Sequence, residues 1–461
     1  MAKTLGIIAE YDPFHKGHAY CLEEAKRVSG ADRTVCVMSG PFVQRGEPAL
    51  LDKYVRAEAA VRNGIDLVLE LPFVYAATGA ENFAHGGVRV LAGLGVCDAL
   101  AFGSERAAES PETAVADLRE VAQTLAFEPK SFSEATQRFM KEGMSYPAAR
   151  QAALLQEFGE ERAQLVQRPN DILAIEYLRQ LILLEAEHTS RGIACFRPAY
   201  MAAEAGKRPE DIALYAIPRY GSGPNGLDEK SGFAGASAIR ALLRVGRFGR
   251  AMAFTPDKTA DVIKDAFIEA IPEVSAWDIK SIPTYEFNFN ASRHRGAVMV
   301  YPDDLFDALR YALLTMDIEE AANVYSAAEG LENRLIEAAG RAGTFAELVQ
   351  LVKTKRYTET RIRRLFLHTA MRLSKQEMDV ALAERLCARV LAFNDAGAEI
   401  LREVHALTPE TYVFQNLRQE QDELERSRGT ISLGIRADKL YHMLGRRALT
   451  GFRYSPEPIK I

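Results

Sequence analysis

Cysteine is scarce in this sequence: five residues among 461 are scattered along the chain, and none belongs to a C-x-x-C pair. This usage excludes a disulfide framework and a zinc knuckle. Long apolar runs are also missing, because charged residues such as Glu70 and Glu185 interrupt them well before membrane-spanning length. The first residues do not combine a basic region, an apolar run and a cleavage site, so we expect no secretion, no membrane association and a cytoplasmic location.

A positive net charge is missing too. The chain has 57 Lys and Arg against 63 Asp and Glu, for a net charge of −6. This balance argues against indiscriminate nucleic-acid binding, although it allows a local basic patch. The length predicts two or more domains, because one core rarely serves so many residues.

The first half of the chain alternates short apolar runs with amphipathic segments. The runs are Leu5–Ala9, Thr34–Met38, Leu67–Leu71, Ala99–Phe102 and Ala213–Ile217, and the amphipathic segments include Lys53–Asn63 and Asp171–Leu184. Nearly uninterrupted apolar runs are typical of strands buried on both faces. The pattern therefore predicts an α/β fold built on a doubly wound parallel sheet.

Two changes in this pattern predict the domain organisation. The strand signal pauses between Arg106 and Gln167, where we expect a helical insertion at about residues 106–167. After about residue 247 the strand signal fades, and helical periodicity dominates from Pro302 through Val404. We therefore expect a catalytic domain over residues 1–246 and a mainly helical domain over residues 247–461.

The most informative motif follows the first predicted strand. A turn that holds His15, Gly17 and His18 leads directly into a helical pattern. A helix that begins after a strand presents unpaired N–H groups and a positive dipole end to an anion. The two imidazoles can add donors to a phosphate, and Gly17 permits close approach to the backbone. A metal site is disfavoured, because the histidine spacing is i, i+3 and no suitable third ligand is near.

Loops after later strands form further candidate elements. Ser39–Pro48 forms a rigid loop, either an ordinary crossover turn or a wall of the site in which Arg45 or nearby Lys53 faces a phosphate or carboxylate. Gly103 ends the fourth strand, where it either makes a turn or packs against a nucleotide. Asn170 or Asp171 can cap the next helix, with an additional bond to nucleotide possible at the edge of the sheet.

A later helix start is a candidate cradle for the β and γ phosphates. Ser237 places a hydroxyl at this start, and Arg240 follows three residues on. Taken alone, Ser237 is better explained as a simple helix cap.

A basic run in the second half is the candidate RNA contact. Its members are Lys353, Lys355, Arg356, Tyr357, Arg361, Arg363 and Arg364. Only Glu359 offsets the cations, and Tyr357 could stack on a base. The alternative is a solvated helix face.

Together these motifs resemble a known family. The HxGH turn with a late Ser-x-x-Arg helix start is similar to the nucleotidyltransferases related to class I aminoacyl-tRNA synthetases. Longer strings are similar to the bacterial tRNA(Met) cytidine acetate ligases: EYDPFHKGH from Glu10, MSGPFVQRGEP from Met38, FGSE from Phe102, RPNDILAIEY from Arg168 and KRYT from Lys355.

The resemblance implies a HIGH-type, Rossmann-like catalytic domain and a C-terminal tRNA-binding domain. It implies a ligase that activates acetate with ATP, forming acetyl-adenylate and pyrophosphate. The acetyl group then passes to the N4 amine of the wobble cytidine of elongator tRNA(Met). The ATP contacts that it implies are Ile7, Ile8, Ala9, Glu10, Tyr11, Asp12, Pro13, Phe14, His15, Lys16, Gly17, His18, Ala19, Tyr20, Gly103, Asn170 and Arg219.

Four positions depart from the family pattern. The family usually has Asn at Asp12 and at Lys16, tends to have Asn at Pro41, and usually has Ser at Gly235. Lys16 could point to solvent. The carboxylate of Asp12 would either weaken ATP binding or hold magnesium.

The resulting mechanism assigns His15 and His18 to the α-phosphate, and Ser237 and Arg240 to the leaving pyrophosphate. Magnesium would arrive with ATP, held mainly by phosphates and water, and no prosthetic group is expected. Two alternatives stay open: a nucleotidyltransferase acting on a small phosphorylated metabolite, and an RNA-binding protein that has lost activity.

Overall fold

The computed structural model describes most of the chain. The described residues are 2–144, 146–194, 211–219, 226–270, 299–327, 330–354, 357–407, 409–415, 425–445 and 457–461. Among the predicted site residues, Lys355 and Arg356 lie outside these ranges. No helix in the described ranges has both the length and the apolar character needed to cross a membrane.

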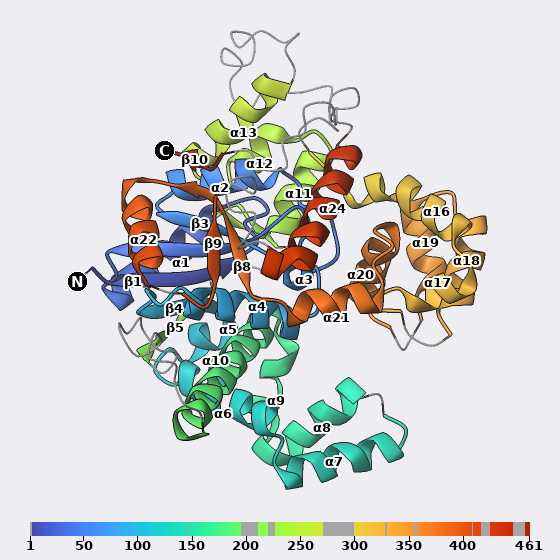
Figure 1. Cartoon of the computed structure of the whole chain (residues 1–461), viewed down its shortest axis with the longest axis horizontal. Helices are drawn as coiled ribbons and strands as arrows, with labels where there is room; N and C mark the ends of the chain where they lie inside the picture. Colours follow the sequence, from blue (N-terminus) through green and yellow to red (C-terminus); the bar gives the residue numbers. More distant parts are fainter. Residues whose placement is uncertain are drawn as a thin grey trace.

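A mostly parallel sheet forms the centre of the molecule (Figure 1). Its first strands are β1 (Thr4–Ala9), β2 (Arg33–Ser39), β3 (Leu67–Leu71), β4 (Ala99–Ser104) and β5 (Ala213–Pro218), and the order is β10-β8-β3-β2-β1-β4-β5. β1 lies between β2 and β4, with Leu5 opposite Thr34 on one side and Ala99 on the other. The prediction of a doubly wound parallel sheet from five apolar runs is confirmed.

Helices cover both faces of the sheet. They include α1 (Lys16–Ser29), α2 (Lys53–Arg62), α3 (Phe73–Ala76), α4 (Ala80–Gly93) and α10 (Pro169–Ala194). Alternate strand residues enter two separate cores: Val35 and Val37 pack with residues of α4 and α10, whereas Cys36 and Met38 pack with residues of α1 and α2. This division explains why the strands are apolar at successive positions.

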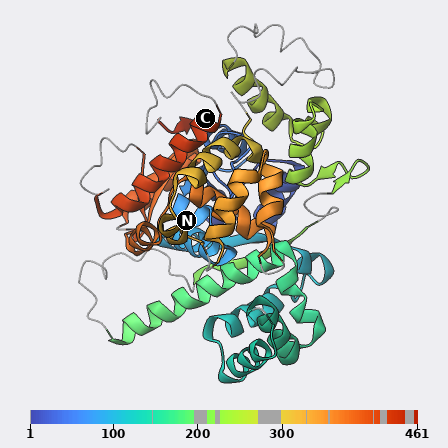
Figure 2. The same cartoon turned by 90° about the vertical axis from the view of Figure 1, so that its right-hand side faces the viewer.

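The segment in which the sequence shows no strand pattern, between β4 and α10, forms a set of helices. These are α5 (Glu105–Glu109), α6 (Ala114–Phe127), α7 (Lys130–Lys141), α8 (Tyr146–Phe158) and α9 (Glu160–Ala163), followed by the 3-10 turn Leu165–Gln167. The segment is therefore helical, and its standing as an insertion in a catalytic domain stays a prediction. Figures 1 and 2 show α10 as a long helix that runs between the sheet and the insertion.

The chain after β5 is mainly helical, as expected. Its elements are β6 (Leu227–Asp228), β7 (Phe233–Ala234), α11 (Ala236–Arg244), α12 (Phe248–Met252), α13 (Asp257–Ala270), a 3-10 turn (Pro302–Leu305), α16 (Phe306–Thr315), α17 (Ile318–Asn323), α18 (Glu332–Arg341), α19 (Phe345–Val352), α20 (Glu359–Ala370), α21 (Lys375–Ala383), β8 (Cys387–Phe393), α22 (Asp395–Ala406), β9 (Tyr412–Phe414), a 3-10 turn (Glu425–Ser427), α24 (Arg428–Leu444) and β10 (Ile459–Lys460).

β8 corrects the expectation that helical periodicity dominates through Val404. This strand pairs antiparallel with β3, and β9 and β10 both pair with β8. Almost all of its residues are buried, so its sequence carries no two-residue alternation that would separate it from a buried helix. The sheet thus crosses the boundary expected near residue 247, and the division into two domains stays a prediction.

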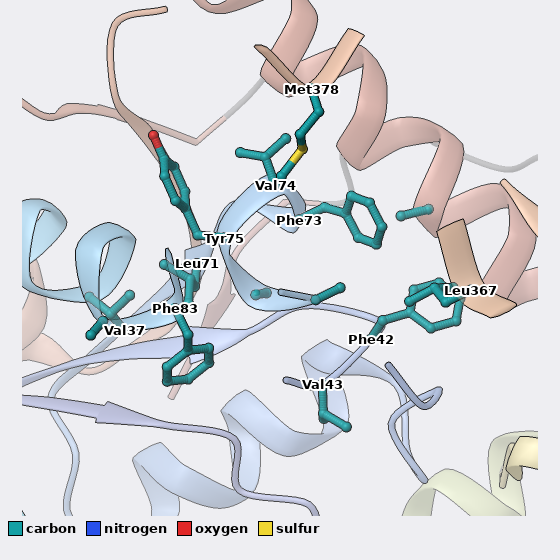
Figure 3. Packing of buried hydrophobic residues seen from close by; sticks show 14 of the residues in the cluster. Val37, Phe42, Val43, Leu71, Phe73, Val74, Tyr75, Phe83, Leu367 and Met378 are labelled. Atoms are coloured by element: carbon teal, nitrogen blue, oxygen red, sulfur yellow. The ribbon is translucent and has the colours of Figure 1, made fainter. Parts of the chain in front are cut away.

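The C-terminal half also packs directly on the first half. Figure 3 shows Leu367 of α20 and Met378 of α21 in one apolar cluster with Phe42, Phe73 and Val74. Residues that lie more than 290 positions apart in the chain therefore share one core. This packing holds α20 in place beside the loop that follows β2.

A buried charge network joins the two halves. Lys53 Nζ lies 2.8 Å from Glu70 Oε1 and 2.7 Å from Asp438 Oδ1. Arg389 Nη1 lies 3.5 Å from Asp438 Oδ2 and 4.0 Å from Glu70 Oε2. The suggestion that Lys53 faces a phosphate is therefore wrong, since two carboxylates from β3 and α24 already surround its ammonium group.

We expect Asp438→Ala to lower the free energy of unfolding by about 3 kcal/mol, because it leaves two buried cations with one carboxylate. Urea denaturation followed by circular dichroism measures the change. The control is Asp261→Ala, at an exposed position of α13, which should change stability by no more than about 0.5 kcal/mol. Equal effects of the two substitutions would contradict the role given to the network.

Candidate functional site

A cavity of about 960 Å³ opens at the carboxyl ends of β1, β4 and β5. Ligands of open α/β sheets bind at this edge, outside the carboxyl ends of the strands. The residues that line the cavity include ten of the fourteen in the predicted ATP segment: Ile7, Ile8, Ala9, Glu10, Tyr11, Asp12, His15, Gly17, His18 and Tyr20. Pro13, Phe14, Lys16 and Ala19 do not line it. Phe14 is buried against Tyr11 and Lys16 is exposed.

The two histidines stack on each other at the start of α1. Their ring centroids are 3.6 Å apart with an interplanar angle of 18°. The His15 backbone N–H donates to His18 Nδ1 at 3.3 Å. Because Nδ1 of His18 accepts this bond, the proton of a neutral ring lies on Nε2, which is left as a donor for a ligand.

Both rings are held in the neutral form. Burial, with the positive charges of Arg219 and Arg240, lowers the pKa of His15 to about 3. Burial and the neighbouring His15 ring lower the pKa of His18 well below its usual value. His15 is 4% exposed, and its Nδ1 has no hydrogen-bond partner among the described residues. A buried imidazole nitrogen without a partner is a site at which a ligand can restore a hydrogen bond.

Gly17 is required by the first histidine. A Cβ at this position would lie 3.0 Å from His15 Cε1 and 3.1 Å from His15 Nδ1. Any other residue would therefore crowd the ring that has the unpartnered nitrogen.

Arg240 of α11 joins the late helix start to the opening turn. It donates to the Asp12 carbonyl oxygen at 2.8 Å, to Asp12 Oδ2 at 3.2 Å and to Ser237 Oγ at 3.1 Å. Asp12 Oδ1 accepts the Leu50 N–H at 2.7 Å. The Asp12 carboxylate is thus occupied by protein donors, and the structure gives no support to its holding magnesium. Among the described residues, no group of three or more His, Cys, Asp or Glu side chains is placed to hold a metal ion.

Gly103, Asn170 and Arg219, which the family resemblance implies as ATP contacts, meet at the cavity wall. A Cβ on Gly103 would lie 3.2 Å from Arg219 Cγ, so glycine allows the arginine to cross the end of β4. Arg219 donates to Asn170 Oδ1, and Asn170 donates to Glu105 Oε1. Asp171 instead accepts the Ser104 hydroxyl at 2.6 Å, which makes it a structural residue.

The loop after β2 forms the opposite wall. Arg56, 1% exposed, donates to the carbonyl oxygens of Glu10, Ser39, Gly40 and Leu51. Gly46 has a φ of +76°, and a Cβ there would lie 2.5 Å from Arg364 Cα. Gly46 therefore allows α20 to touch the loop, and Arg45 lines the cavity.

The basic run divides between the cavity and the surface. Arg363 and Arg364 line the cavity, where Arg363 pairs with Glu47 and Arg364 Nη1 donates to the Gln44 carbonyl oxygen at 3.3 Å. Lys353 and Arg361 are exposed. Tyr357 is 8% exposed, and the Arg361 guanidinium lies 4.8 Å from its ring centroid. Because the Tyr357 ring is buried beneath Arg361, it is not placed to stack on a base.

Sequence reasoning did not single out several lining residues. Glu105 lies two residues after Gly103, and Tyr177 ends the RPNDILAIEY string, so both had a local signal. Glu47 lies inside the loop already considered. Phe233 of β7 had none, because a two-residue strand leaves no pattern in the sequence.

Comparisons with known proteins agree on one family. The family described as HIGH Nucleotidyl Transferase matches residues 2–194 and 198–451. A tRNA(Met) cytidine acetate ligase of Syntrophomonas wolfei is 34% identical over 98% of this chain and 99% of its own length. One from a Thermoanaerobacter species is 34% identical over 88% of this chain and 86% of its own length. The crystal structure of Thermotoga maritima TmcAL bound with alpha-thio ATP has a TM-score of 0.79 and 28% identity, covering 100% of both chains.

We expect His15 and His18 to stay neutral in the ligand-free protein between about pH 8 and pH 5, since their pKa values lie below the ordinary value. Nitrogen NMR of labelled imidazoles measures this, with assignments from His15→Gln and His18→Gln. The unfolded chain binds these protons near pH 6.5, so both groups reduce stability as the pH falls below that value. Titration of either folded ring near pH 6.5 would show that burial does not control its charge.

Proposed function

Because the chain belongs to the HIGH nucleotidyl transferase family and, within it, to the tRNA(Met) cytidine acetate ligases, we propose that it joins acetate to the wobble cytidine of elongator tRNA(Met) at the expense of ATP. One observation carries this proposal. The paired imidazoles, the start of α1 and Arg240 converge on one cavity beyond the first strand. Because its substrate would be tRNA, the enzyme would act in the cytoplasm.

In the first step an acetate oxygen attacks the α-phosphorus of ATP. A P–O bond to acetate forms, the bond to the β-phosphate oxygen breaks, and pyrophosphate leaves. This reaction needs positioning and charge stabilisation more than covalent help from the protein. His18 Nε2–H and the neutral His15 ring would donate to the α-phosphate oxygens, which would lie at the positive end of the α1 dipole.

The leaving pyrophosphate would lie against Arg240 and Ser237. The adenosine would lie along the wall formed by Gly103, Asn170 and Arg219. Magnesium would be held mainly by phosphate oxygens and water, since the Asp12 carboxylate is already occupied. Its chemistry is to neutralise charge on the phosphates.

In the second step the acetyl group moves to tRNA. The N4 nitrogen of cytidine bonds to the acetyl carbon, and AMP departs with the anhydride oxygen. The base must leave its stack to enter the cavity. Lys353 and Arg361 of the basic run are exposed to solvent and would attract the phosphate backbone of the tRNA.

Incubation with ATP, labelled acetate and unmodified tRNA tests this function directly. Label on the N4 amine of the tRNA(Met) wobble cytidine supports the ligase. Adenylylation of another substrate would instead support the small-metabolite enzyme, and tight tRNA binding without turnover would support an inactive RNA-binding protein.

The double variant His15→Ala, His18→Ala should form acetyl-adenylate about 100-fold more slowly or worse, because it loses donors to the transition state. Acetate-dependent exchange of labelled pyrophosphate into ATP measures this half-reaction. Far-ultraviolet circular dichroism provides the control for folding. Near-normal exchange in a folded double variant would remove the two histidines from the mechanism.

The double variant Lys353→Glu, Arg361→Glu should raise the tRNA concentration needed for half-maximal turnover by about tenfold or more and weaken its salt dependence, because phosphate contacts are lost. Pyrophosphate exchange without tRNA should be unchanged. Lys141→Glu, at an exposed position of α7 in the insertion, is the matched control. An unaltered tRNA requirement would show that the tRNA lies elsewhere.

A further inference from the structure

Glu10 is among the ATP contacts that the family resemblance implies, but no chemical step described above uses its carboxylate. It follows β1 directly and lines the cavity. Its Oε1 accepts the Gln44 N–H at 2.8 Å, and its carbonyl oxygen accepts a bond from Arg56 Nη1 at 2.7 Å. Protein donors therefore hold both its side chain and its backbone.

Four charged or titratable groups lie near this carboxylate: Asp12 on the same turn, Arg45 on the loop after β2, Arg240 on α11 and Tyr177 on α10. Burial raises the pKa of Glu10, and Asp12 adds to this effect. The Gln44 N–H and the two arginines act in the opposite direction, and the net change is upward. A carboxylate with a raised pKa accepts a proton more readily than an exposed one.

Glu10 lies between the two walls of the cavity. On one side are the histidines and Arg240. On the other side is the loop of Gln44, which contacts Arg363 and Arg364 of α20. A volume of about 960 Å³ is near the upper end for a small-ligand site, so an acceptor base has room beside a nucleotide.

The attacking amine of cytidine is a weak nucleophile, because its lone pair is delocalised into the ring. It also has to lose a proton when it becomes an amide. We propose that the Glu10 carboxylate accepts this proton while the N4 nitrogen attacks acetyl-adenylate. The N–C bond forms, the bond from the acetyl carbon to the phosphate oxygen breaks, AMP leaves with that electron pair, and the proton ends on Glu10. This inference rests on the proposed function.

The test separates the two half-reactions in Glu10→Gln. Pyrophosphate exchange with ATP and acetate reports on acetyl-adenylate formation, and rapid mixing of enzyme-bound acetyl-adenylate with tRNA reports on acetyl transfer. We expect acetyl transfer to slow about 100-fold, and to slow at least about tenfold more than pyrophosphate exchange does. The wild-type transfer rate should increase with pH through the carboxyl titration and then level off, and the variant should lack this increase.

Glu23→Gln, at an exposed position of α1, is the matched control and should transfer acetyl at the wild-type rate. Wild-type transfer by Glu10→Gln would overturn the inference, and so would an equal loss of both half-reactions, which indicates a part in ATP binding only. Failure of the wild-type enzyme to acetylate tRNA would instead refute the proposed function.

Discussion

The contact between Arg240 and Asp12 connects two parts of the site that are 228 residues apart in the chain. Arg240 binds both the backbone and the carboxylate of Asp12, while a second residue of its own helix, Ser237, accepts a further bond. Because Asp12 is 3% exposed, water competes little for this pairing. The pairing fixes the turn before the histidines and brings a cation to the start of α1. The Asp12 carboxylate gives Arg240 a full counter-charge.

On the opposite wall of the cavity, the loop after β2 is also held in place by contacts with distant residues. Arg56 ties its ends to β1, and the absence of a side chain at Gly46 lets α20 pack against it. Because α20 contains Arg361, Arg363 and Arg364 of the basic run, this contact brings the cations proposed to bind tRNA close to the cavity. The reaction has two steps: acetate first receives the adenylyl group of ATP, and cytidine then receives the acetyl group. The tRNA must therefore lie close to the nucleotide, because acetyl-adenylate has to react where it is formed.

The sequence predicted the first half of this fold well. Buried parallel strands are continuous apolar runs, and all five runs proved to be strands of the sheet. The nucleotide contacts came from the family resemblance. Gly103, Asn170 and Arg219 converge because they lie at the ends of β4 and β5 and at the start of α10, at one edge of the sheet. β8 was missed because a buried strand and a buried helix look alike over seven residues. Lys53 was misjudged because its partners, Glu70 and Asp438, come from distant elements. The hydrogen bond from the Gln44 N–H to Glu10 could not be predicted either, because Gln44 is also distant from Glu10 in the sequence.

The central claim is that ATP lies over the end of β1 with its α-phosphate at the paired imidazoles. A crystal structure of this chain with a non-hydrolysable ATP analogue tests it most directly. The account predicts α-phosphate oxygens within hydrogen-bond distance of His15 and His18, with the terminal phosphates toward Arg240 and Ser237. A nucleotide bound elsewhere, with the histidines untouched, would contradict it.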